Sequence, residues 1–446
     1  MRPQPPGPKG LPVVGNARRY ARDPFSFLDA CAEAYGDVIS LRFGPMDAYA
    51  VTNPDEIERI LVTEAATFRK PSFRDDAVED LLGDGLLLSE GERWRRQRDL
   101  AQPAFAMSRI TELDGLMTDR TLDVVADWRD GDVVDVEGEM ARLTVSIIVE
   151  AMFGTSLTDE QVETVHEHLE PLGARFEPDP LRFLLPNWTP TRENREYRRA
   201  VRALEGVLDE VVAERRGTEF GDGGDQPTDL LSILLRAQAR GEQSEEQLRD
   251  ELMTMLLAGH DTTALTLTYA WLHLSAHPNV EARVHEELAG VVAGDVPTAG
   301  EARRLSYVER VLQETMRVDP PVYTLFREPE VDVRVGGYRI PEGAAVMLPQ
   351  WVVHRSPRWW DDPETFDPDR FLPARSGDRP RYAYFPFGAG PRHCIGKQFS
   401  MLEAKLVLGT IAERFRLTRA DSGPLERRGS LTMHPKEPPK MRLHAR

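Results

Sequence analysis

The chain has 446 residues with a formal net charge of −18, and its only cysteines are Cys31 and Cys394. This acidic balance argues against nucleic acid or an anionic membrane as the main partner, and two cysteines exclude a disulfide framework. Only six of the 56 basic residues are Lys, which fits either a salt-rich cytoplasm or a GC-rich genome. Because no apolar run approaches the roughly 20 residues that span a bilayer, we expect a cytoplasmic protein without a transmembrane anchor.

The first elements expected along the chain follow a Pro-rich segment over residues 1–20. Residues 24–35 place apolar side chains at helical spacing and stop at Gly36, which predicts a helix. Residues 38–43 and 48–52 alternate apolar and polar side chains around a Gly-Pro turn, which predicts a β-hairpin. Residues 54–62 return to a helical pattern.

The next stretch, residues 70–90, has weak helical signals and predicts a long loop. Long loops in compact proteins are often binding elements. A helix then begins near Gly91 and carries Trp94 and Arg98, which lie on one face because they are four residues apart. Other arginines stand alongside, so a solvated basic helix is the alternative interpretation.

Two pairs of helices are expected in the following hundred residues. Residues 113–153 predict one pair and residues 155–215 a second pair around a Pro-rich connection. Residues 217–225 are rich in Gly and acidic side chains, which predicts a surface loop.

A long helix is expected to begin at Ser244 and to stop at Pro278. Its middle combines two small residues with an acid and a hydroxyl, Ala258, Gly259, Asp261 and Thr262. Glycine costs about 1 kcal/mol relative to alanine within a helix, and threonine hydroxyls compete for backbone carbonyls. We therefore expect a local break in the helical hydrogen bonds, of the kind often found at functional sites.

A shorter helix from about Tyr307 carries Glu314 and Arg317, three residues apart and therefore on one side. Such a pair is common on protein surfaces and means little by itself. After the helix ends at a Pro-Pro step, residues 322–327 read as the start of a strand, and Arg370 follows in a Pro-x-Arg-Phe element.

A glycine-rich loop near the C-terminus presents one sulfur atom. It has the spacing Phe-x-x-Gly-x-Arg-x-Cys-x-Gly, met at Phe387, Gly390, Arg392, Cys394 and Gly396. A helical pattern follows, so the cysteine precedes a helix N-terminus, which is expected to favour the thiolate. A buried structural cysteine is the alternative reading of such a residue alone.

This spacing, together with the motifs before it, resembles the cytochrome P450 family along essentially the whole chain. The resemblance implies a mainly α fold with small β-sheets (α+β), a triangular helical prism that encloses haem b, and a small N-terminal β-rich lobe. It implies one domain over residues 1–446, of the soluble prokaryotic type, with no separate reductase domain.

The resemblance also implies the haem contacts. Cys394 would be the axial thiolate ligand of the iron, as in that family. The rest of the cofactor-binding set would be Trp94, Arg98, Ala258, Gly259, Arg327, Phe387, Gly390, Arg392 and Gly396. Within it, Trp94 and the arginines would bind the propionates, and the two small helix residues would leave room for the macrocycle and O₂.

The remaining implied roles are catalytic, structural and substrate-binding. Thr262 would donate a hydrogen bond to bound oxygen and Asp261 would relay protons to it. Glu314, Arg317 and Arg370 would form a buried charge triad behind the cysteine loop. The expected substrate-pocket residues are Leu257, Val322, Tyr323, Thr324 and Leu431.

The predicted function is a haem-thiolate monooxygenase that inserts one oxygen atom from O₂ into a small hydrophobic substrate. Its two electrons would come from a separate partner of the ferredoxin or flavodoxin type. Two alternatives stay open: a peroxide-driven peroxygenase or isomerase, and a non-catalytic haem-binding sensor.

Overall fold

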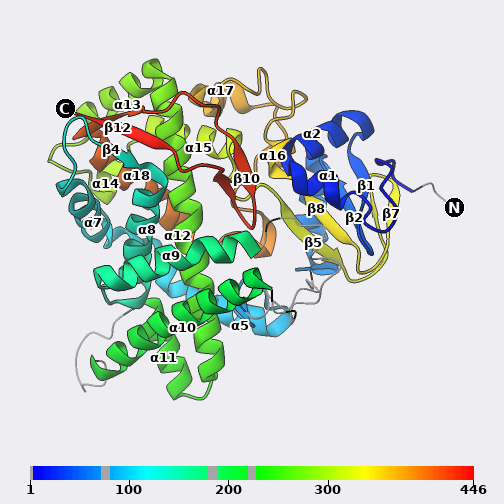
Figure 1. The fold of residues 1–446 in the computed structure, drawn as a ribbon, viewed down its shortest axis with the longest axis horizontal. Helices are drawn as coiled ribbons and strands as arrows, with labels where there is room; N and C mark the ends of the chain where they lie inside the picture. Colours follow the sequence, from blue (N-terminus) through cyan, green and yellow to red (C-terminus); the bar gives the residue numbers. More distant parts are fainter. Residues whose placement is uncertain (1–3, 72–80, 176, 178–188, 190, 219–227) are drawn as a thin grey trace.

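The computed structural model describes residues 4–71, 81–175, 177, 189, 191–218 and 228–446. Helices dominate, and among the described residues the strands form four small sheets. Figure 1 shows the largest sheet beside α1 and α2 at one end of the molecule, with most of the helices at the other end. The predicted mainly α architecture with a β-rich N-terminal lobe is confirmed.

The N-terminal lobe begins with two helices, α1 (Ala17–Arg22) and α2 (Pro24–Tyr35). The second has the predicted bounds because the Asp23 carboxylate caps it, accepting hydrogen bonds from the backbone N–H groups of Phe25 at 3.1 Å and Ser26 at 3.0 Å. The hairpin pairs β1 (Val38–Phe43) with β2 (Met46–Val51). The second strand begins two residues earlier than predicted, because Gly44, with φ 59°, turns the chain within two residues.

The largest sheet is completed by distant parts of the chain, in the order β1-β2-β8-β5-β3. Its other strands are β3 (Phe68–Arg69), β5 (Leu325–Pro329) and β8 (Ala345–Leu348). The smaller sheets contain β4 (Val133–Asp135), β6 (Val333–Val335), β7 (Tyr338–Ile340), β9 (Phe415–Arg419), β10 (Arg427–Gly429), β11 (Met433–Pro435) and β12 (Lys440–Ala445). Strands β10 and β11 form a hairpin whose tip lies next to α12 through a hydrogen bond between Thr432 and Asp261.

The helical part is built around α12 (Glu245–Ala276), which packs against α8 (Val136–Phe153). Its predicted start is confirmed by a reciprocal cap between Ser244 and Gln247. The other α-helices are α3 (Pro54–Glu58), α5 (Gly91–Ala101), α6 (Met107–Thr111), α7 (Asp114–Ala126), α9 (Asp159–Arg175), α10 (Arg192–Thr218), α11 (Leu230–Ala239), α13 (Pro278–Val291), α14 (Ala299–Ala302), α15 (Ser306–Val318), α16 (Gln350–Val353), α17 (Pro373–Ser376) and α18 (Lys397–Ala412).

Short helical turns join these elements. They are a π turn η1 (Arg59–Thr63) and the 3₁₀ turns η2 (Ala65–Thr67), η3 (Gln102–Phe105), η4 (Pro368–Phe371), η5 (Arg381–Ala383) and η6 (Gly390–Arg392). The two predicted helical pairs are confirmed as α7 with α8 and α9 with α10. Residues 72–80 of the expected 70–90 loop, most of the Pro-rich connection and most of the acidic loop lie outside the described residues.

The predicted break in the middle of α12 is wrong, since the helix is continuous from Glu245 to Ala276. Each threonine hydroxyl donates to the backbone carbonyl four residues earlier, which also accepts the helical N–H, so the helix is not interrupted. Thr262 Oγ1 donates to the Ala258 carbonyl at 3.3 Å, and Thr266 Oγ1 donates to the Thr262 carbonyl at 2.8 Å. Both bonds run parallel to the helical ladder and leave it intact.

Gly259 has a different neighbour from the one expected. A Cβ built on it would lie 2.6 Å from Ile148 Cγ1 on α8, closer than carbon atoms approach. The missing side chain therefore allows α8 and α12 to pack closely. Gly259 and Ala258 both line the cavity described below, and Ala258 is the more exposed of the two.

We expect Gly259→Ala to lower the urea midpoint of unfolding, because overpacking costs about 1–3 kcal/mol and outweighs the gain of about 1 kcal/mol in helix propensity. Gly206 is the matched control, since it lies within α10 and a Cβ added to it would meet no atom within 4 Å. Gly206→Ala should raise the midpoint. Equal stabilisation by both substitutions would contradict the packing role of Gly259.

Candidate active site

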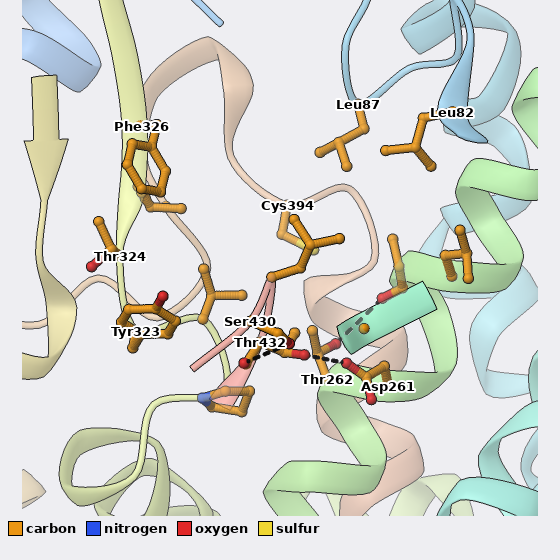
Figure 2. A pocket seen from close by; sticks show the side chains of 18 of the residues that line it. Leu82, Leu87, Asp261, Thr262, Tyr323, Thr324, Phe326, Cys394, Ser430 and Thr432 are labelled. Atoms are coloured by element: carbon orange, nitrogen blue, oxygen red, sulfur yellow. Dashed lines mark hydrogen bonds between the residues drawn. The ribbon is translucent and has the colours of Figure 1, made fainter. Parts of the chain in front are cut away.

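A cavity of about 1740 Å³ lies between the two parts of the fold. Figure 2 shows Cys394 inside it, with Asp261 and Thr262 of α12 on one wall and Tyr323, Thr324 and Phe326 on another. The tip of the β10–β11 hairpin and residues 81–88 complete the lining. The cavity therefore brings together residues that are more than 300 positions apart in the sequence.

Local backbone geometry presents the sulfur of Cys394 to this cavity. The Cys394 N–H donates to the Phe387 carbonyl at 2.9 Å and closes the loop. Gly390, with φ 64°, lies so close to η1 that a Cβ there would overlap the Leu61 carbonyl oxygen. The Cys394 side chain is exposed towards the cavity, whereas the other cysteine, Cys31, is buried in α2.

The electrostatics of Cys394 combine two opposing effects. Burial raises the pKa of its thiol. The N–H groups of Gly396 and Lys397 at the helix N-terminus, together with the charge of Arg98, lower it. The helix N-terminus therefore favours the thiolate, as expected, but burial outweighs this contribution.

A cluster of cations lines the cavity near this sulfur: Lys70, Arg98, Arg327 and Arg392. Burial and the charges of Arg327 and Arg392 lower the pKa of Lys70 to about 7, and burial and Arg392 lower the pKa of Arg327 to about 10. Glu90 forms an ion pair with Arg392. Its negative charge opposes the lowering of the pKa of Lys70, Arg327 and Arg392. Such crowding of positive charge suits a ligand with carboxylate groups.

Three of the predicted cofactor residues, Arg98, Arg392 and Trp94, also make contacts with protein groups. Arg98 donates to the His393 carbonyl at 2.8 Å, which ties α5 to the cysteine loop. The guanidinium of Arg392 lies 4.3 Å from the ring centroid of Trp94. Lys70 was not predicted, because a single lysine at the start of a long loop carries no sequence pattern.

The wall formed by α12 carries the predicted acid and hydroxyl. Asp261 is half-buried, and its Oδ2 accepts a hydrogen bond of 2.7 Å from Thr432 Oγ1. His434 Nε2 lies 3.6 Å from Asp261 Oδ1. Sequence reasoning missed both partners, since no pattern in residues 429–434 indicates which of them face α12.

The structure brings the three residues of the predicted triad together in the core. Arg317 donates to both oxygens of Glu314, at 2.7 and 2.8 Å, and Arg370 Nε lies 3.3 Å from Glu314 Oε1. All three side chains are almost inaccessible to solvent. The triad reaches the cysteine loop through His354, whose carbonyl accepts from Arg317 and whose ring accepts from the Phe385 N–H at 3.0 Å.

Comparison with known proteins decides the family. The family model described as Cytochrome P450 matches residues 5–441. The chain belongs to the cytochrome P450 family. The chain is 36% identical to a "Cyclooctatin synthase" and 33% identical to a "Cyclooctat-9-en-7-ol 5-monooxygenase", both of Streptomyces melanosporofaciens, over 92% of its own length and 89% and 88% of theirs. It is 32% identical to a "Pentalenene oxygenase" of Streptomyces avermitilis, over 92% of this chain and 90% of that protein.

As a P450, the protein is a monooxygenase that uses haem with a cysteine thiolate as axial ligand. The cavity fits this cofactor in three respects. It contains one thiol open to a metal, a cluster of cations for carboxylates, and walls in which apolar surface predominates. Among the described helices none is long and apolar enough to cross a bilayer.

The remaining predicted residues of this P450 also border the cavity, with one exception. Phe387, Gly396, Leu257, Val322, Tyr323, Thr324 and Leu431 line it, but Gly390 does not, because it packs against η1. Tyr323 contributes little, since its ring packs against Phe25 at 5.2 Å and its hydroxyl lies 3.4 Å from that of Tyr20. Leu431 is half-exposed at the tip of the β10–β11 hairpin.

Proposed function

We propose that Cys394 is the iron ligand of this P450 and that Asp261 and Thr262 deliver protons to O₂ during insertion of one oxygen atom into a hydrophobic substrate. The observation that supports this best is the shared cavity. Cys394, the acid and the hydroxyl all line it, although they come from two separate elements. A structural cysteine would not need such access.

Haem, when bound, supplies the one-electron and oxygen chemistry. The chain's own residues hold and orient it. Cys394 binds the metal, and Arg98, Arg327, Arg392 and Trp94 bind the propionates. Lys70 joins this set, because its lowered pKa reports positive neighbours that a carboxylate would neutralise.

The residues of α12 transfer protons to O₂. The small side chain of Ala258 leaves space for O₂ beside the helix. Thr262 would exchange its 3.3 Å hydrogen bond to the Ala258 carbonyl for one to O₂ by rotation of its hydroxyl. Asp261, the residue before Thr262 on α12, relays protons to the cavity and acts as general acid.

We propose a cyclic hydrocarbon or its alcohol, of the terpenoid class, as the substrate. The apolar lining supports this, and so do the names of two relatives, which refer to cyclooctat-9-en-7-ol and to pentalenene. The electrons are proposed to come from a ferredoxin-type or flavodoxin-type protein. A second cavity beside the cysteine loop, lined by Arg303, Arg381 and Lys397, would suit an acidic partner.

Asp261→Asn should lower kcat for substrate oxidation by about a hundredfold, because the amide cannot supply a proton. Substrate binding should change little. The measurement is product formed per NAD(P)H consumed, with a competent reductase and a panel of cyclic terpenes. Hydrogen peroxide alone supporting equal turnover in parent and variant would favour the peroxygenase alternative, and haem uptake without substrate-linked NAD(P)H oxidation would favour the sensor.

A further inference from the structure

Asp261 is one end of a hydrogen-bonded chain that crosses three elements. Thr432, at the tip of the β10–β11 hairpin, donates to Asp261 Oδ2 at 2.7 Å. His434 on β11 lies 3.0 Å from Thr432 Oγ1 through its Nε2. Its Nδ1 lies 2.8 Å from Oε1 of Glu137 in the first turn of α8.

The directions of these bonds follow from which atoms carry protons. An ionised Asp261 or Glu137 can only accept, and the hydroxyl of Thr432 has a single proton to donate. Since Thr432 gives that proton to Asp261, its oxygen must accept from His434 Nε2–H. His434 also donates from Nδ1 to Glu137, so both ring nitrogens carry protons and the side chain is an imidazolium.

The surrounding charges favour this state. Burial opposes the charge of His434, but Asp261 and Glu137 outweigh it and raise the pKa of the imidazole. Arg428 of β10 acts against them, and it is itself paired with Glu177 at 3.1 Å. Among the described residues, His260 of α12 also interacts with His434, and burial lowers the pKa of its imidazole.

We propose that His434 is a positioning residue that supplies protons to Asp261 through Thr432, and that Glu137 keeps it charged. The proton on His434 Nε2 moves to Thr432 Oγ1 while the hydroxyl proton moves to Asp261 Oδ2. No electrons are transferred, and His434 becomes neutral, with the proton on Nδ1 still donated in a hydrogen bond to Glu137 Oε1. It recovers a proton from solvent, to which its side chain is 19% exposed.

This inference rests on the proposed role of Asp261, and it makes the β10–β11 hairpin the route by which solvent protons reach the cavity. It also explains why a histidine and a carboxylate occupy the border of a largely apolar cavity.

The test compares Thr432→Val, which removes the hydroxyl, with Thr432→Ser, which keeps it. In the holoenzyme with its reductase, we expect Thr432→Val and His434→Gln to lower kcat by about tenfold. The parent's kcat should fall as pH rises through the pKa of His434, Thr432→Ser should retain that fall, and the other two variants should lose it. Parent-like pH profiles in Thr432→Val and His434→Gln would overturn the relay.

A second readout does not depend on turnover. NMR titration of the histidine ring protons in the diamagnetic ferrous carbon monoxide form should give His434 a pKa above that of exposed histidines, and Glu137→Gln should lower it. An unchanged pKa in Glu137→Gln would overturn the part assigned to Glu137. If Asp261→Asn itself has no effect on kcat, the proposed function fails; if it slows turnover while the relay variants do not, only the relay fails.

Discussion

Replacing Cys394 by alanine should abolish the thiolate-ligated haem and all oxygenase activity. The sulfur is the soft donor that lines the cavity, and the cluster of cations beside it can hold carboxylates but not the metal. Haem content and the absorption spectrum of the purified variant measure the effect.

Cys31→Ala is the matched control for this experiment. Cys31 is buried in α2 and does not line the described cavities, so its thiol has no access to the cofactor. This variant should keep the full haem content and the parent spectrum. Loss of the spectrum in Cys31→Ala but not in Cys394→Ala would show that Cys31 is the ligand instead.

Replacing Glu314 by glutamine should have the second largest effect, a destabilisation of about 3–5 kcal/mol. Glu314 accepts two hydrogen bonds from Arg317 and one of 2.9 Å from the Asp367 N–H, and it faces Arg370 as well. The amide would leave two buried guanidinium groups without a counter-charge. We expect a lower urea midpoint, a poor yield of haem-loaded protein, and a loosened cysteine loop through His354.

The control is Glu196→Gln, which breaks an exposed pair with Arg192 on α10. Solvent already screens that pair, so the midpoint should not change. A midpoint for Glu314→Gln that equals this control would show that the triad does not stabilise the core.

Local signals in the sequence predicted the elements and the residues of the cysteine loop. Helix α2 ends where Gly36 stands, and α12 begins where Ser244 and Gln247 cap it, because caps act within one turn. The spacing around Cys394 could be recognised because the backbone geometry of the loop itself requires glycines at fixed positions.

Tertiary neighbours could not be read in the same way. The pairing of Asp261 with Thr432 joins residues 171 positions apart, and nothing in either segment specifies the other. The sequence predicted room at Gly259 but not that this residue faces Ile148. It placed Cys394 before a helix but did not indicate that burial would raise the pKa of the thiol. These properties depend on packing between elements, which leaves no periodic pattern.

The carbon monoxide spectrum of the reduced protein tests the central claim most directly, because the absorption maximum reports which atom binds the iron opposite to carbon monoxide. Cys394 as a thiolate ligand predicts the red-shifted maximum of thiolate-bound haem in the parent and its loss in Cys394→Ala. A maximum where histidine-bound haems absorb, or a red-shifted maximum that persists in Cys394→Ala, would contradict the account.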